Sequence, residues 1–162
     1  YADRHPDGYS HRDAERHGSG ETMKQSLPHF EGPQVLYRPY STENAWLEVP
    51  FKVERKEPLR LLVDATTSYD FGRYQAFLDG IKIGKEFDLY SPEIGQKEIH
   101  LLDFWPDPGQ YTLRLRCVGK NPASSGYYLG IESVKLRERR PRVMQYARDK
   151  DKDWRKEPIL YE

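Results

Sequence analysis

An alternation of apolar and polar residues recurs through the middle of the chain and constrains the fold more than any other feature. In residues 46–53, Leu47, Val49, Phe51 and Val53 share one face, whereas the positions between them hold Glu, Pro and Lys. Successive side chains of a β-strand point to opposite faces, so this pattern predicts a half-buried strand. The proline on the outward set indicates a position at a sheet edge.

The same alternation returns in residues 59–65 and 111–117, and a shorter strand is predicted around residues 99–101. Cys117, the single cysteine of the chain, falls on the apolar face of its strand. This position predicts a small buried core residue rather than a reactive nucleophile. A single cysteine also excludes an intrachain disulfide.

The dipeptide Asp79-Gly80 separates two β-rich runs, residues 74–78 and 81–83. It is a strong hairpin signal, because a type I′ turn needs positive φ at both central positions. Many short strands separated by turn signals, with no amphipathic helix between them, indicate an all-β protein. We therefore predict an antiparallel β-sandwich of the jelly-roll type, with an irregular N-terminal arm and a charged C-terminal tail.

The chain divides into three zones. Residues 1–20 are polar, lack periodicity and predict an extended arm; residues 21–137 form the β-sandwich module; residues 138–162 form a charged tail interrupted by prolines. The chain starts at Tyr1 without a signal-like apolar segment. We therefore expect a processed product, an expressed fragment, or one piece of a larger polypeptide.

Charge and hydropathy exclude two classes of partner. The 26 Lys and Arg residues balance the 26 Asp and Glu residues, so no global field favours nucleic acid or an anionic membrane. No apolar run approaches the roughly 20 residues that a membrane-spanning helix needs. The sequence therefore predicts a soluble protein that binds neither nucleic acid nor membrane.

The sequence contains no motif for catalysis. It lacks a phosphate-binding loop, a dinucleotide-binding glycine pattern and a zinc-protease helix. His5, His11 and His17 recur every six residues, a spacing that matches neither a helix face nor a usual zinc site. Carboxylates are numerous, but none stands out as the pair that a glycosidase needs. We predict no catalytic residue and a protein that is not an enzyme by itself.

Aromatic residues at loop positions suggest a binding role instead. Tyr40, Tyr69 and Tyr127 lie in turn-rich segments, with Asp70 and Asn121 as nearby polar residues. A flat ring beside hydrogen-bonding groups suits a sugar, whose faces are apolar and whose rim carries hydroxyls. These five residues are the predicted carbohydrate-binding residues. The alternative is that the rings fill the ends of the sandwich.

Glu132 is a charged residue in a segment that is otherwise predicted to be a buried strand. In a regular strand from Gly130, Glu132 shares its face with Val134 and Leu136, so its carboxylate would point inward. A buried carboxylate needs a cation, an arginine or water at the rim of the sandwich. A β-bulge near residues 131–133, or burial of both faces, is equally compatible with the sequence.

Three runs, residues 71–84, 87–91 and 118–136, resemble the β-sandwich domain, similar to carbohydrate-binding modules, that is appended to family 172 glycoside hydrolases. The similarity covers roughly residues 21–137. The loop Gly119-Lys-Asn-Pro-Ala-Ser-Ser-Gly126, with the Tyr residue that follows it, is its most specific part. More distantly, the chain is similar to carbohydrate-binding modules of families 6 and 35.

The resemblance implies a structural calcium ion, with Glu21 on the first strand and Glu132 near the last as candidate ligands. Glu132 stands where those modules have Asp, and Thr22 and Lys24 replace their usual acidic cluster. An arginine or backbone donors are therefore alternative partners for Glu132.

The resemblance also implies a non-catalytic accessory module of a larger carbohydrate-active protein, in a secreted or periplasmic bacterial setting. Its partner would then be a glycan. The alternative is a structural module that packs on a catalytic domain or a sister subunit without binding sugar itself.

Overall fold

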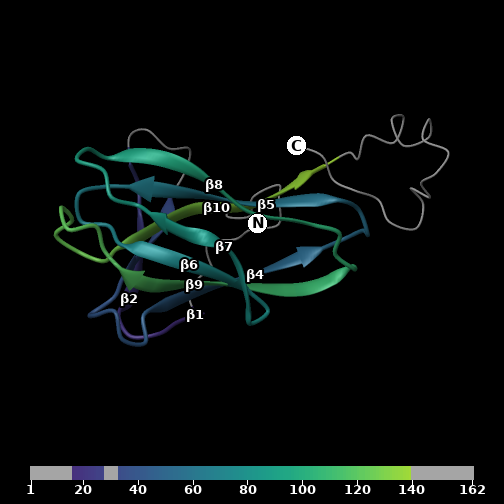
Figure 1. Cartoon of the computed structure of the whole chain (residues 1–162), viewed down its shortest axis with the longest axis horizontal. Coiled ribbons are helices and arrows are strands. Elements are labelled where there is room, and N and C mark those ends of the chain that lie inside the picture. The colour runs from purple at the N-terminus through teal and green to yellow at the C-terminus, as the bar shows by residue number, and fades with distance from the viewer. Residues whose placement is uncertain (1–15, 28–32, 140–162) are drawn as a thin grey trace.

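The computed structural model describes residues 16–27 and 33–139, which form ten strands in two five-stranded antiparallel sheets (Figure 1). Sheet one contains, in order across the sheet, β1 (Arg16–His17), β4 (Trp46–Val53), β9 (Gly109–Gly119), β6 (Arg73–Leu78) and β7 (Ile81–Asp88). Sheet two contains β2 (Glu21–Gln25), β3 (Gln34–Arg38), β10 (Leu129–Glu138), β5 (Leu59–Thr67) and β8 (Gly95–Phe104). The predicted all-β antiparallel sandwich is confirmed. No helix within these ranges is long and apolar enough to cross a membrane.

The inward faces of the two sheets make one apolar core. The alternating residues predicted to be buried are buried, apart from Tyr111, which is partly buried, and Cys117 on β9 is only 2% exposed. Completely buried members of the core include Leu47, Val49, Leu61, Val63, Leu113, Leu115 and Ile131. Each such side chain stabilises the fold by roughly 1.5–3 kcal/mol relative to an exposed one. The sandwich is therefore held mainly by apolar burial.

The predicted hairpin joins β6 to β7. Asp79 has φ 47° and Gly80 has φ 84°, the positive pair that a type I′ turn needs. The turn is also bound to β9, since the Asp79 N–H donates to the Thr112 carbonyl at 3.0 Å. The Thr112 N–H in turn donates to Asp79 Oδ1 at 2.8 Å.

The chain ends enter the sandwich only in part. Residues 16–17, inside the predicted arm, pair with β4 as the short strand β1. The pairing with β1 reaches only Leu47 and Glu48 of β4. Pro50 therefore has a neighbouring strand, β9, on one side only within the described ranges, and a proline, which has no N–H to donate, is tolerated at such an edge. Of the predicted tail, Arg139 donates its N–H to the Pro58 carbonyl at 2.8 Å. His5 and His11 lie outside the described residues.

Strand β10 contains the β-bulge that resolves the problem of Glu132. Ile131 pairs with Ala65, but Ser133 pairs with Asp64, so the register shifts between Ile131 and Ser133. The bulge alternative is confirmed, and the regular strand is wrong, because the extra residue reverses the parity at Glu132. Burial of both faces is confirmed as well, since every residue from Leu129 to Val134 is buried. Its carboxylate instead accepts a hydrogen bond from Gln96 Nε2 on β8 at 2.5 Å.

Candidate functional site

A groove of about 210 Å³ crosses the outer face of sheet two, where the end of β5 meets the segments that precede β8 and β10. Leu36, Arg38 and Thr66 lie on this outer face because they alternate with buried residues of β3 and β5. The complete lining is Gln25, Leu27, Leu36, Arg38, Thr66, Ser68, Tyr69, Asp70, Phe71, Ile94 and Tyr128. The groove thus combines two tyrosine rings with several hydrogen-bonding side chains.

Tyr69 and Asp70, two of the predicted sugar-binding residues, lie together in this groove. Tyr69 is 55% exposed, so much of its side chain is available to a ligand. Their backbone is fixed by the loop before β10, since Ser125 donates its N–H to the Tyr69 carbonyl at 3.0 Å. Tyr128 donates its N–H to the Asp70 carbonyl at 3.1 Å. The backbone that carries the exposed Tyr69 ring is therefore held in place by hydrogen bonds.

Ser124 attaches the same loop to the segment that carries Tyr69. Its side chain is almost completely buried, with 3% of the residue exposed. The hydroxyl donates to the Phe71 carbonyl at 2.7 Å and lies 3.2 Å from the Tyr69 carbonyl. It also accepts the Gly126 N–H at 3.3 Å. One buried hydroxyl thus connects both chain segments that form this end of the groove.

Arg38 supplies the cation of the groove. Its guanidinium carbon lies 5.4 Å from the centre of the Tyr128 ring, within the range of a cation–π contact. The pKa of Arg38 is raised, first by hydrogen bonding to Tyr128 and also by the charges of Glu21 and Asp70. Arg38 therefore stays charged and connects the Tyr128 ring to the nearby carboxylates.

A polar network lies beneath the groove. Gln25 Nε2 and Thr66 Oγ1 both donate to Oε1 of Gln34, which is completely buried. Gln34 Nε2 has no hydrogen-bond partner among the described residues. Of these three residues only Gln25 is partly exposed, so its amide can exchange hydrogen bonds with a ligand rich in hydroxyls, while Gln34 and Thr66 support it from below.

Two other predicted residues lie outside the groove lining and have different surroundings. Tyr40 is 77% exposed on the loop that follows β3. Asn121 is used within the fold, because its Nδ2 donates to Asp88 Oδ2 at 2.9 Å. Its Oδ1 accepts the Ala123 N–H at 3.0 Å, which shapes the turn.

Tyr127 is also outside the groove lining. Its ring packs against the apolar core and lies 5.9 Å from Lys120 Nζ. Its carbonyl accepts a hydrogen bond from the buried Tyr74 hydroxyl at 2.5 Å. This placement matches the alternative in which the ring fills an end of the sandwich.

Arg38, Thr66 and Tyr128 line the groove but are not among the five predicted carbohydrate-binding residues. A period-two signal for β3 was present, because Val35 and Tyr37 alternate with more polar neighbours. Leu36 on the outward face weakens this signal. Thr66 lies on β5, and it comes close to the side chains of β3 because β10 pairs with both β3 and β5. No local sequence pattern specifies this order of strands.

The two candidate calcium ligands do not come together. Glu21 lies opposite Arg38 in the β2–β3 pair, and its Oε1 is 3.6 Å from the Arg38 guanidinium. Glu132 follows Ile131, which is opposite Val35, so Glu21 and Glu132 are offset by about four residues, or about 13 Å, along the strands. Within residues 16–27 and 33–139, no group of three or more His, Cys, Asp and Glu side chains could hold a metal ion. The described donors therefore do not fit a calcium site.

The groove offers no pair of groups for hydrolysis. Asp70 is the only carboxylate among its lining residues, whereas glycoside hydrolysis uses two. Cys117 lies in the core, and burial raises the pKa of its thiol above the ordinary value. A buried thiol of this kind is a poor nucleophile. The geometry therefore suits binding better than bond cleavage.

Solved structures share this architecture. The chain is similar to a part of Paenibacillus xanthan lyase, with a TM-score of 0.71 and 20% identity over 83% of this chain and 13% of the enzyme. It is also similar to the C-terminal family 6 carbohydrate-binding module of a marine laminarinase from Zobellia galactanivorans. There the TM-score is 0.50 and the identity 14%, over 79% of this chain and 95% of the module.

This chain has the β-sandwich fold of that carbohydrate-binding module. A third similar structure is a Paenibacillus cycloisomaltooligosaccharide glucanotransferase, with a TM-score of 0.55 and 11% identity over 83% of this chain and 19% of the enzyme. The chain thus spans less than a fifth of either enzyme. No protein-family model and no curated protein sequence matches it. The relation to family 172 glycoside hydrolases remains a prediction from the sequence.

Proposed function

We propose that this chain is a non-catalytic carbohydrate-binding module whose ligand lies in the groove on sheet two. The observation that carries the proposal is the exposed Tyr69 ring beside Asp70, Arg38 and Tyr128. Sugar rings have apolar faces that stack on aromatic rings, and hydroxyl rims that exchange hydrogen bonds with charged and polar groups. The groove offers both kinds of contact within one hollow.

We propose further that the module is an accessory part of a larger carbohydrate-active protein. Support comes from the similar structures, two of which are enzymes with a glycan in their names and one of which is a binding module of a laminarinase. We propose a secreted or periplasmic setting, which the resemblance to modules of glycoside hydrolases implies. In this arrangement the module keeps a partner domain close to its glycan.

Affinity gel electrophoresis tests the proposal with the folded chain and gels containing xanthan, dextran, laminarin, xylan or mannan. We expect retardation in at least one gel and loss of that retardation in the Tyr69→Ala variant, because packing of a sugar face on the tyrosine ring is removed. Tyr40→Ala is the matched control, since Tyr40 is more exposed than Tyr69 but does not line the groove. Its retardation should equal that of the unmodified chain.

Two outcomes contradict the proposal. If no glycan retards the chain, and the chain co-purifies with a catalytic domain or sister subunit, the module has an assembly function instead. If Tyr69→Ala loses binding only because its thermal unfolding shifts to lower temperature, the ring is structural. Melting curves of both tyrosine variants separate these cases.

A further inference from the structure

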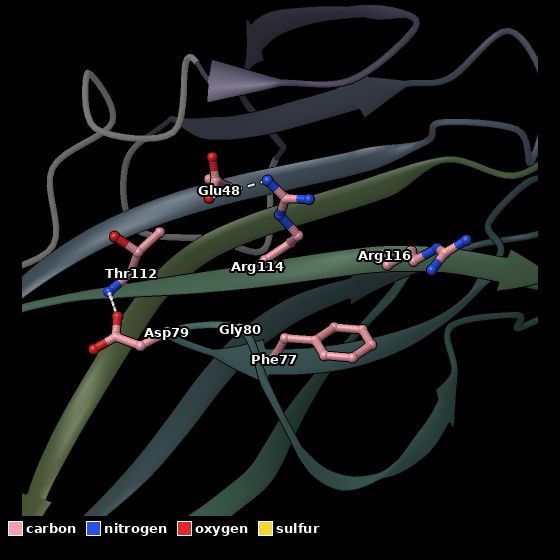
Figure 2. Close-up of a pocket in the computed structure, with 7 residues that line it drawn as sticks. All are labelled: Glu48, Phe77, Asp79, Gly80, Thr112, Arg114 and Arg116. Carbon is pink, nitrogen blue, oxygen red and sulfur yellow. Dashed lines mark hydrogen bonds and ion pairs between the residues drawn. The ribbon is translucent and has the colours of Figure 1, made fainter.

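A second hollow lies on the outer face of the opposite sheet (Figure 2) and encloses about 480 Å³. It falls within the range of about 300–1,000 Å³ that ligand pockets usually have. It is lined by Glu48, Phe77, Asp79, Gly80, Thr112, Arg114 and Arg116. These residues come from β4, β6, β9 and the β6–β7 turn, so this hollow shares no residue with the groove on sheet two.

The pairing of the strands brings cations and an aromatic ring together on this face. Arg114 lies between Glu48 on β4 and Phe77 on β6, and Phe77 is opposite Lys82 on β7. Arg116 is two residues further along β9, about 7 Å from Arg114. Figure 2 shows the Phe77 ring and the Arg116 side chain extending in the same direction.

Glu48 and Trp46 hold Arg114 in place. The two carboxylate oxygens of Glu48 contact different arginines, Arg16 at 3.2 Å and Arg114 at 3.4 Å. The Arg114 guanidinium carbon also lies 4.0 Å from the centre of the Trp46 ring, a close cation–π contact. One carboxylate is thus shared by two cations. With Arg116 and Lys82, four cations lie around the hollow against the two carboxylates Glu48 and Asp79.

The side chain of Arg116 is exposed and makes no hydrogen bond or ion pair with any residue in the described ranges. Asp79, the other carboxylate of the hollow, accepts the Thr112 N–H and so serves the hairpin turn. The Arg116 guanidinium and the partly exposed Phe77 ring are therefore both available to a ligand. Guanidinium groups bind carboxylates with two parallel hydrogen bonds.

We propose that this face binds a carboxylate-bearing polysaccharide, with a sugar ring against Phe77 and its carboxylate on Arg116. The positive charge of Arg116 favours an anionic ligand, and the Phe77 ring favours a ligand with a flat apolar face, such as a sugar ring. The site adds to the proposed glycan binding on sheet two and does not depend on it.

Isothermal titration with polygalacturonate tests the proposal on the full chain. We expect binding, and a dissociation constant about tenfold or more higher for Arg116→Gln, because a charge-assisted contact is lost. Arg137→Gln removes the same charge from sheet two, where Arg137 pairs with Glu98 at 3.0 Å, and should bind like the unmodified chain. Phe77→Leu should weaken polygalacturonate binding and leave the melting temperature unchanged. Tyr69→Ala should bind polygalacturonate normally.

Several results would overturn the proposal. The chain could fail to bind polygalacturonate, or Arg116→Gln and Arg137→Gln could weaken binding equally, which indicates a general charge effect. Equal affinity for poly-glutamate would indicate an acidic protein partner, and equal affinity for dextran sulfate would show that carboxylate is not selected. Loss of binding in Tyr69→Ala alone would assign polygalacturonate to the groove on sheet two. Neutral glycans in the gel assay report on that groove separately.

Discussion

Replacement of Ser124 by Ala tests whether one buried hydroxyl holds the end of the groove together. The substitution removes the hydroxyl that donates to the Phe71 carbonyl at 2.7 Å and that accepts the Gly126 N–H at 3.3 Å. Loss of one partner of a buried hydrogen bond costs about 1–3 kcal/mol. For a chain of this length the melting temperature should fall by roughly 2–4 °C for each kcal/mol, or roughly 2–12 °C in total.

Differential scanning calorimetry measures this change, and Ser125→Ala is the matched control. Ser125 is the exposed neighbour, and its hydroxyl has only a 3.5 Å contact with the Tyr69 carbonyl. An exposed substitution of this type should change stability by no more than about 0.5 kcal/mol. Equal melting temperatures for the two variants would refute the reasoning. We also expect Ser124→Ala to weaken any glycan binding that depends on Tyr69, because it loosens the segment that carries the ring.

Two further predictions concern alkaline pH and chelation. Burial raises the pKa of Tyr37 to about 12 from its ordinary value of 10.0, so the folded chain retains a proton that the unfolded chain loses. The stabilisation is complete below about pH 10 and should disappear as the pH rises towards about 12, measured as the urea midpoint. The Tyr37→Phe variant should lose less stability over that interval, and an identical pH dependence would contradict this cause. Chelation with EDTA should leave the melting temperature unchanged, because Glu21 and Glu132 are apart; a decrease would reveal a bound metal.

Much of the architecture could be predicted from local sequence patterns. The alternation in residues 46–53 and 111–117 identified strands with their buried faces, because period-two patterning depends only on the sequence of one strand. Asp79-Gly80 identified the β6–β7 hairpin, since the backbone preference of these residues is local. The sequence around Glu132 allowed a regular strand or a bulge. The pairing of β10 with β5 decides between them.

The groove on sheet two could be predicted only in part. Tyr69 and Asp70 were selected because their residue types and loop position suggested a sugar site, and they do line the groove. Asn121 and Tyr127 were selected for the same reason. The Asn121 side chain, however, hydrogen-bonds within its own turn, and the Tyr127 ring packs against the core. Whether a loop side chain faces a ligand or its own protein depends on neighbours that are distant in sequence.

The sequence by itself determined the fold class, the faces of its clearest strands and the position of one hairpin, because these follow from local backbone preference and side-chain alternation. Only the tertiary structure decided which strands are neighbours, and therefore which side chains meet. Arg38 meets Tyr128 through the pairing of β3 with β10, and Arg114 lies between Glu48 and Phe77 through the pairing of β9 with β4 and β6. The physical reason is that strand pairing satisfies backbone hydrogen bonds between distant segments, while burial of the whole core selects one arrangement.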